Sequence, residues 1–452
     1  MNPSSSSPVS SAANDSGPSS AGQAPAPGGA LAGVRIVDLT AVIFGPYCTQ
    51  ILADYGADVI KVEAPEGDTT RWTGPSLDHG RAAIFLAANR NKRSVVLDLK
   101  QAAARDALLA LVDTADVFVH SVRPQKLEKL GLGPQALMAR NPRLIYAGLH
   151  GFGSDGPYAG QPAYDDIIQG LSGVADLMER QTGTPRYFPT IAADKACGQV
   201  AAHAILAALF QRERTGRGQC VEVPMFESMT SFMLVEHFYG RHLALEETPG
   251  AARTGAEGAH GAASEAHSAG YPRLLTPWRR PQRTADGHVC ILPYTTAHWK
   301  LFFEHAGHPE LAADPRFQDI ASRTRHIAEL YEIAGEIVAR HDTAHWLDLC
   351  QRLEIPAAPV NRLEDMEHDP HLKAVELFPT VHGDDGSACR LVRNPVRLAD
   401  SEVPIRMPPS LGEHTLEVLA EAGLDADAIR RLVGSGAARV RAAGPGGPEQ
   451  EQ

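Results

Sequence analysis

The sequence lacks the signals of several protein classes. No uninterrupted apolar run reaches the ~18 residues that a membrane span needs, and no H-E-x-x-H motif is present. There is no block of lysine and arginine, and the net charge is −12, which argues against nucleic acid as a partner. The six cysteines form no C-x-x-C pair, so we expect reduced thiols in a cytoplasmic protein and no bound metal. They are Cys48, Cys197, Cys220, Cys290, Cys350 and Cys389.

Both ends of the chain are poor in aliphatic side chains. Residues 1–29 are mainly Ser, Pro, Ala and Gly, and residues 442–452 are again rich in Gly and Pro. Such segments cannot bury enough apolar surface to offset the entropy lost on ordering. We predict two disordered tails. The first also lacks the basic start and apolar centre of a signal peptide.

Between the tails, strand-like and helix-like segments alternate. Strand 34–39, helix 47–55 and strand 57–63 form a βαβ unit of about 30 residues. Further strands are predicted at 94–99, 117–120, 144–148 and 220–223, and further helices at 102–112 and 225–239. This alternation predicts an α/β fold with a doubly wound parallel sheet, and a ligand at the carboxyl ends of its strands.

The second half has a different pattern. An Asp-Gly turn at 286–287 predicts a hairpin over 283–291, and helices are expected around 299–306, 327–341 and 343–353. We therefore predict a large domain over 30–225, a smaller α+β domain over 226–355 with a glycine-rich loop at 249–270, and a return to the large domain over 356–441. Residues 355–360 are expected to be a stiff connector.

One glycine motif needs a structural test. Residues 151–156 match G-x-G-x-x-G after a strand. A dinucleotide fingerprint must next open a helix, so that the pyrophosphate sits on the helix N-terminus. Here Pro157, Gly160 and Pro162 follow. We predict a loop, which argues against a dinucleotide-dependent oxidoreductase.

The stretch from Pro185 to Cys220 carries the main candidate site. Apolar residues at helical spacing predict a helix from Lys195 to about Arg214, ended at Thr215-Gly216. Asp194 stands before it, so it is either an N-cap or a nucleophilic carboxylate kept ionised by the helix dipole. Spacing alone leaves both open.

Cations lie beside the predicted strand ends in this acidic chain. They are Arg71, Arg90, Lys92, Arg93, Lys100, Arg123 and Lys129. Each is either a solvated side chain or part of a site for an anionic, phosphate-bearing ligand.

Several stretches together resemble one family, the class III (CaiB/BaiF-type) CoA-transferases, which includes formyl-CoA transferase, carnitine CoA-transferase and 2-methylacyl-CoA racemase. The matching stretches are GVRIVDLTAVIFGPYCTQILADYGADVIKVEAPEGD, NRNKRSVVLDLK, LGLGPQALMARNPRLIYAGLHGFG, GPYAGQPAYDDIIQGLSG, LAALFQRERTGRGQCVEVPMFE, IPAAPVNRLEDMEHDPHL and LGEHTLEVL. They follow the family's order from Leu31 to about Val433.

The resemblance implies a Rossmann-like large domain, a smaller domain and an interlocked homodimer. It also implies a transferase of sulfur-containing groups that binds no permanent cofactor and uses a coenzyme A thioester and a carboxylic acid acceptor as substrates. Asp194 falls at the family's catalytic aspartate. The family's CoA contacts fall on Val42, Ile43, Leu97, Lys100, Ser121, Val122, Arg123, Lys129, Tyr164 and Asp165.

Some positions depart from parts of the family. Formyl-CoA transferases have glutamine at Ile43 and arginine at Ala64, which argues against formyl/oxalate exchange. Racemases pair a histidine with an aspartate, and we place these positions at Met138 and Asp165. Methionine cannot titrate, although His150 is a conceivable substitute. A racemase and a non-catalytic CoA-binding protein are the alternatives, and the acyl groups, of which small or dicarboxylic acids such as succinate are examples, are not identified.

Overall fold

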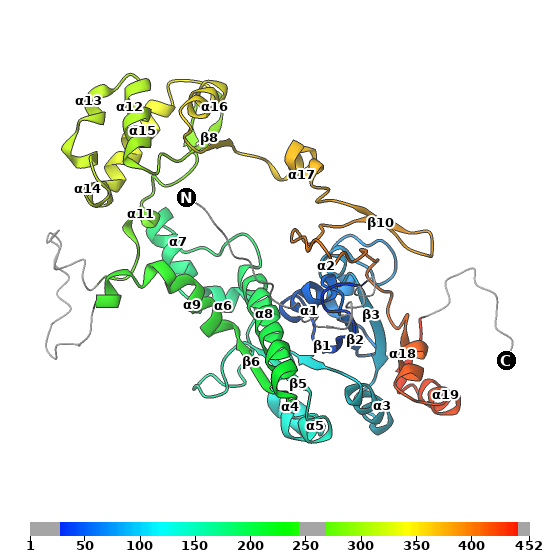
Figure 1. The fold of residues 1–452 in the computed structure, drawn as a ribbon. Helices are drawn as coiled ribbons and strands as arrows, with labels where there is room; N and C mark the ends of the chain where they lie inside the picture. The colour runs from blue at the N-terminus through cyan, green and yellow to red at the C-terminus, as the bar shows by residue number, and fades with distance from the viewer. Residues whose placement is uncertain (1–27, 244–267, 442–452) are drawn as a thin grey trace, which may run out of the picture.

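The computed structural model describes residues 28–243 and 268–441 (Figure 1). The predicted tails over 1–29 and 442–452 and the predicted loop over 249–270 therefore lie almost entirely outside the described residues. Gly29 is an exception, because its carbonyl oxygen accepts the N–H of Ala32 at 2.9 Å. A Cβ atom at Gly29 would lie 2.3 Å from the carbonyl oxygen of Tyr55. Gly29 is thus packed against the folded protein and does not belong to a disordered tail.

A seven-stranded sheet forms the centre of the molecule, in the order β12-β3-β2-β1-β4-β5-β6. Its strands are β1 (Arg35–Leu39), β2 (Asp58–Glu63), β3 (Lys92–Leu97), β4 (Val117–His120), β5 (Ile145–His150), β6 (Cys220–Pro224) and β12 (Ala438–Arg439). All pairs are parallel except β12 with β3. The predicted parallel sheet is confirmed, and its order 3-2-1-4-5-6 is that of doubly wound sheets. The order reverses between β1 and β4.

Helices cover both faces of this sheet. Side chains alternate along each strand, so Ile36 packs into one apolar core and Val37 into another. The first core is completed by α1 (Phe44–Asp54), α8 (Ala192–Thr215) and α9 (Met225–His237), and the second by α3 (Ala102–Asp113), α5 (Pro134–Arg140), α18 (Thr415–Glu421) and α19 (Ala426–Gly434). Figure 1 shows α1 and α8 on one side of the strands and α3, α5 and α19 on the other. Two buried faces explain why the strands read as continuous apolar runs.

The end of the described chain returns to the sheet. Ala438 pairs with Leu97, and the N–H of His414 donates to the carbonyl oxygen of Ser94 at 3.0 Å. The N–H of Val96 donates to the hydroxyl of Thr415 at 3.2 Å. Residues more than 300 positions apart therefore complete the edge of the sheet beside β3.

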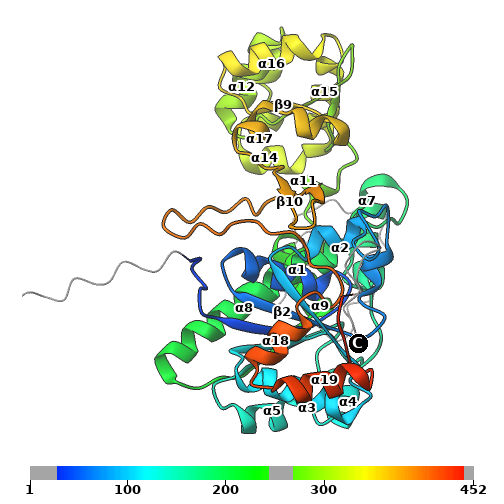
Figure 2. The same cartoon turned by 90° about the vertical axis from the view of Figure 1, so that its right-hand side faces the viewer.

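A separate apolar core lies above the sheet in Figure 2. It holds a three-stranded sheet of β7 (Gln282–Arg283), β8 (His288–Ile291) and β9 (Ala357–Pro359), with α12 (Thr296–His305), α15 (Ile327–Val338) and α16 (Thr343–Arg352). The predicted hairpin is confirmed, because β7 and β8 pair antiparallel. The predicted connector over 355–360 is corrected, since its middle residues are strand β9, paired with β8.

Shorter elements join these parts. They are α2 (Ala83–Ala88), α4 (Pro124–Lys129), α6 (Asp165–Leu171), α7 (Val174–Thr182), α11 (Pro272–Leu275), α13 (Pro309–Ala312), α14 (Ile320–Arg325), α17 (Pro370–Ala374), β10 (Thr380–His382) and β11 (Ala388–Arg390). Among the described residues, no helix is both long and apolar enough to cross a membrane.

Candidate active site

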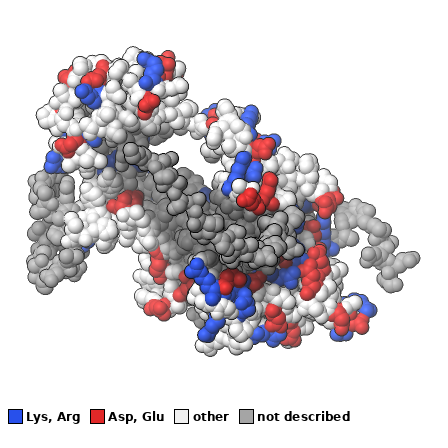
Figure 3. All heavy atoms as spheres, viewed as in Figure 1, with Lys and Arg blue, Asp and Glu red and all other residues white. Residues whose placement is uncertain are grey.

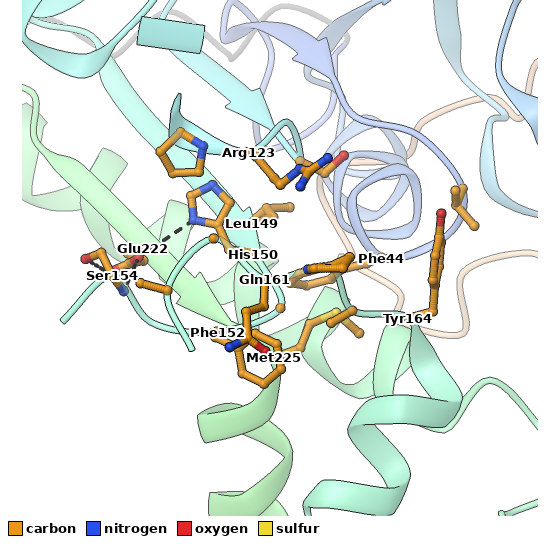
Figure 4. Close-up of a pocket in the computed structure, with 18 of the residues that line it drawn as sticks. Phe44, Arg123, Leu149, His150, Phe152, Ser154, Gln161, Tyr164, Glu222 and Met225 are labelled. Carbon is orange, nitrogen blue, oxygen red and sulfur yellow. Dashed lines mark hydrogen bonds and ion pairs between the residues drawn. The ribbon is translucent and has the colours of Figure 1, made fainter. Parts of the chain in front are cut away.

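A cavity of about 390 Å³ opens at the carboxyl ends of the sheet strands (Figure 4). Its walls come from the segments that follow β1, β4 and β5, together with the end of β6 and the start of α8. The cavity therefore lies at the edge predicted for a ligand, beside the point where the strand order reverses. The G-x-G-x-x-G stretch is one of these segments, and as predicted it forms a loop that opens no helix.

Asp194 lines this cavity from the first turn of α8. The helix begins at Ala192, three residues earlier than predicted, and its N-cap residue is Ile191. Asp194 is thus not the N-cap, and its side chain does not cap the helix. Because Asp194 is only 8% exposed, its carboxylate is partly desolvated where it faces the cavity.

Asp165 holds the start of α8 in place of a capping residue. Its Oδ1 atom accepts the backbone N–H of Asp194 at 2.9 Å. The other oxygen of Asp165 accepts a hydrogen bond from Nε2 of Gln169. The same amide group also donates to the carbonyl oxygen of Thr190 at 3.1 Å. Gln169 is fully buried and ties α6 to the segment before α8. No role was predicted for Gln169 from the sequence, because its one local signal is a side-chain amide four residues after Asp165.

The surroundings of Asp194 favour its neutral form. Burial, and next the nearby Asp165 carboxylate, raise the pKa of Asp194 to about 7. The predicted effect of the helix dipole, which favours the ionised form, is opposed here by burial and by Asp165, which both favour the neutral form. Three N–H groups of the first turn have partners within the protein, those of Ala192, Asp194 and Lys195. The carboxylate therefore sits in an apolar, like-charged environment that gives it a near-neutral pKa.

The loop between β1 and α1 approaches the cavity in a strained conformation. Val42 lines the cavity with φ +68°, a left-handed value that β-branched residues rarely adopt. Its N–H faces both oxygens of Asp68, at 3.3 and 3.2 Å. Asp68 is paired with the buried Lys61 at 2.9 Å, and Lys61 also donates to the carbonyl oxygen of Thr40. A buried ion pair thus holds the loop in a shape it would not adopt alone.

The structure separates the predicted site residues into three groups. Those that line the cavity are Val42, Ser121, Arg123, Tyr164 and Asp194. Those that are buried or half-buried but do not line it are Ile43, Leu97, Val122 and Asp165, and of these Leu97 lies in β3, which does not border the cavity. Lys100 and Lys129 are exposed outside the cavity, after β3 and at the end of α4.

Most of the other cations considered as ligand contacts belong to the fold. Arg71 is completely buried and makes two hydrogen bonds of 2.7 Å with Glu63. Arg90 pairs with Asp54, and Arg93 pairs with Asp58. On the face drawn in Figure 3, basic and acidic side chains are interspersed. These arginines are therefore neutralised by carboxylates and do not form an anion site.

Several cavity residues carried no functional expectation. Glu222 on β6 accepts the N–H and the hydroxyl of Ser154 at 3.0 and 2.9 Å, and it lies 3.7 Å from Nδ1 of His150. Phe44, Phe152 and Met225 add apolar wall. The one feature that these three apolar residues share in the sequence is their position, since each lies a few residues after the end of a parallel strand.

Met138 does not bear on the chemistry of this cavity. It lies in α5, packs against the core beneath the sheet and contacts Sγ of Cys220 through its sulfur at 3.4 Å. We placed the histidine position of the racemases at Met138, but Met138 does not line the cavity, so this residue cannot decide between a transferase and a racemase. The titratable side chains that line the cavity and could take part in proton transfer include those of His150, Tyr164, Asp194 and Glu222.

The chain belongs to CoA-transferase family III, which residues 31–415 match. It is 35% identical over 407 residues to a succinyl-CoA:mesaconate CoA-transferase of Haloarcula hispanica, with 88% of this chain and 97% of that protein covered. It is 34% identical over 394 residues to a probable fatty acyl-CoA transferase of Mycobacterium tuberculosis, covering 86% and 97%. A crystal structure of a CAIB/BAIF family protein from Brucella suis superposes with TM-score 0.70 at 32% identity, covering 87% of this chain and 100% of that one.

Proposed function

We propose that this protein is an acyl-CoA:carboxylate CoA-transferase that works through an aspartyl-CoA thioester on Asp194. Family membership supports a transferase that acts on CoA thioesters. The observation that carries the mechanism is the position of Asp194 in the first turn of α8. Its side chain lines the cavity, and its backbone N–H donates a hydrogen bond to Asp165.

The chemistry follows from a carboxylate nucleophile. Asp194 attacks the thioester carbonyl and expels CoA thiolate, leaving a mixed anhydride. The thiolate then attacks the aspartyl carbonyl, releases the donor acid and leaves an aspartyl-CoA thioester. An acceptor carboxylate attacks this thioester, and the returning thiolate attacks the acceptor's acyl carbonyl. The second acyl-CoA leaves and Asp194 is regenerated.

The walls of the cavity suit these intermediates. Anhydrides hydrolyse in water, so the site must exclude it. Phe44, Phe152 and Met225 provide apolar wall, and each is at most 6% exposed. The near-neutral pKa of Asp194 leaves a large part of it ionised near pH 7, while its low hydration keeps it reactive.

For the binding of CoA, we propose different roles for the predicted contact residues. Val42, Ser121, Arg123 and Tyr164 would contact the pantetheine arm within the cavity, and their neighbours Ile43, Val122 and Asp165 would support that wall. Leu97, at the end of β3, would lie near the adenine. Lys100 and Lys129 would meet the distant phosphates, which is consistent with their exposure.

We further propose that the protein is a homodimer. Figure 2 shows the core around α15 and α16 set apart from the large sheet, and exposed apolar side chains lie on both parts. Examples are Phe210, Phe232, Val235, Val360 and Leu363, with exposures of 46–79%. A second copy of the chain would cover part of this exposed apolar surface.

Intact-protein mass spectrometry tests the mechanism. Incubation with an acyl-CoA should add the mass of CoA less one water, and hydroxylamine should release the CoA as its thiol and leave a hydroxamate on the peptide that contains Asp194. Asp194→Asn should lose the adduct while CoA binding survives. Asp166→Asn, which changes the exposed neighbour of Asp165, should keep it. An adduct that persists in Asp194→Asn would show that another residue is the nucleophile.

A further inference from the structure

The cavity wall holds both apolar and polar side chains. Figure 4 shows Arg123 above Phe152 and Met225, with Gln161 beside Phe152 and with Phe44 on the side toward Tyr164. The side chains of Phe44, Phe152 and Met225 are 6%, 6% and 4% exposed, so they belong to the core as well as to the wall. A ligand in this cavity therefore meets two distinct environments.

The backbone of two of these apolar residues lies against the helix that carries the proposed nucleophile. Sγ of Cys197, one turn along α8 from Asp194, contacts the carbonyl oxygen of Met225 at 3.5 Å. On the same helix, a Cβ atom at Gly198 would lie 3.0 Å from the carbonyl oxygen of Phe44. Met225 and Phe44 thus flank the start of α8, where the acyl carbonyl must lie for Asp194 to attack it.

The charges of the cavity oppose a second carboxylate. Among the described residues that line it, Arg123 is the only lysine or arginine, and the proposed function assigns Arg123 to CoA. Glu222 adds a carboxylate that Ser154 fixes through two hydrogen bonds. An acid with a free distal carboxylate would bring that charge into a cavity that already holds the carboxylates of Glu222 and Asp194 against the single guanidinium of Arg123, and like charges in one site repel each other.

Resting on the proposed function, we propose that the acyl groups exchanged here are apolar, those of short or medium aliphatic or aromatic monocarboxylic acids. Dicarboxylic acids, which the names of several relatives contain, are poor substrates of this protein. Glu222 is the specificity-determining residue that disfavours them. The raised pKa of Asp194 fits this reading, because a further carboxylate would protonate the nucleophile more.

Two donors of the same shape provide the test. Succinyl-CoA and 4-methylpentanoyl-CoA have equal numbers of non-hydrogen atoms, and a carboxylate in the first replaces an isopropyl end in the second. With one fixed acceptor, such as butyrate, kcat/KM should favour 4-methylpentanoyl-CoA by about tenfold or more. Equal values, or a preference for succinyl-CoA, would overturn the proposal.

Variants test the role of Glu222. Glu222→Gln keeps an oxygen acceptor for Ser154 and removes the charge, so the ratio of the two kcat/KM values should fall several-fold. Glu227→Gln is the matched control, since Glu227 accepts the N–H of Gly153 at 2.9 Å but does not line the cavity. An unchanged ratio in Glu222→Gln would overturn the assignment of Glu222.

The adduct assay separates this proposal from the one it rests on. If neither donor loads CoA onto Asp194, the proposed mechanism fails. If succinyl-CoA loads it as fast as 4-methylpentanoyl-CoA, the mechanism stands and the acyl specificity is refuted.

Discussion

Oδ1 of Asp165, in α6, accepts a hydrogen bond from the backbone N–H of Asp194 at 2.9 Å, so two carboxylates meet at the first turn of α8. Asp165 does two things at once in this position. It satisfies an N–H that the helix cannot pair internally, and its charge raises the pKa of Asp194 beyond the effect of burial. The same residue therefore fixes the backbone of the proposed nucleophile and adds to the effect of burial on its pKa.

The first prediction concerns this pH. Because the ionised form of Asp194 attacks, the rate of adduct formation in the wild type should rise with pH through about 7. Asp165→Asn removes the second cause of the raised pKa, so the midpoint should move to lower pH. It should not return to an ordinary aspartate value, since burial is the larger cause. Rapid-quench mass spectrometry of the intact protein, which counts the CoA adduct across pH 5–9, measures the midpoint.

Asp166→Asn is the control for this experiment. Asp166 is adjacent to Asp165 but exposed, and its removal should leave the midpoint in place. A midpoint that stays near 7 in Asp165→Asn would show that Asp165 does not act on the charge of Asp194.

The second prediction concerns stability. The folded pKa of Asp194 lies above its unfolded value of about 4, so the unfolded state loses this proton first as pH rises. The free energy of unfolding should therefore fall between about pH 4 and pH 7 by an amount due to Asp194, and then level off. Asp194→Asn removes this loss, so it should be more stable than the wild type above pH 7, by on the order of 2–4 kcal/mol at most.

Urea unfolding of both proteins at pH 4, 5.5, 7 and 8.5 measures this difference. It should be smallest at pH 4 and constant above about 7. A difference that is independent of pH would mean that Asp194 titrates normally in the folded protein.

Which parts of this structure could be predicted depended on how local their signals were. The strands of the sheet carry apolar β-branched runs, for example Val95-Val96 in β3, and the first of them are joined by a short βαβ unit. The start of α8 was misplaced because Ala192 and Ala193 carry no capping signal, and Asp165 supplies the cap from another helix. Strand β12 has two residues and pairs only through tertiary context.

The chemistry of the site was predictable only in part. The resemblance placed Asp194, and the structure puts it in the cavity, but the sign of its pKa shift depends on burial and on Asp165. Arg71 and Lys100 look alike in sequence, yet one is buried against Glu63 and the other is exposed. The apolar wall comes from Phe44, Phe152 and Met225, which only the fold brings together.

The third prediction uses that contrast between Arg71 and Lys100. Arg71→Met leaves the carboxylate of Glu63 buried without its partner, so the free energy of unfolding should fall by roughly 3–5 kcal/mol. Lys100→Glu should leave stability nearly unchanged and raise KM for acyl-CoA more than it lowers kcat, because a contact to a distant phosphate contributes uniform binding. Urea unfolding and initial rates at two salt concentrations measure both.

Lys300→Glu is the matched control, since Lys300 is an exposed lysine of α12 in the other apolar core. It should change neither quantity. An unaltered KM in both Lys100→Glu and Lys129→Glu would place the CoA phosphates elsewhere.

The last prediction separates transfer from racemisation. Inversion at the α-carbon of an acyl-CoA requires two groups on opposite faces, one that removes a proton and one that supplies it. Of the titratable side chains that line the cavity, Asp194 is the proposed nucleophile, and Glu222 is bound to Ser154. Burial lowers the pKa of His150, so near neutral pH it has no acidic proton to supply. We therefore expect ping-pong transfer between (2S)-2-methylbutanoyl-CoA and butyrate in deuterated water, without deuterium at the α-carbon and without inversion. Mass spectrometry and chiral chromatography of the thioester measure both.

Slow deuterium uptake with retained configuration would mean that one group alone reaches the α-proton. Rapid inversion that is lost in His150→Gln would instead identify His150 as the second base and the protein as a racemase.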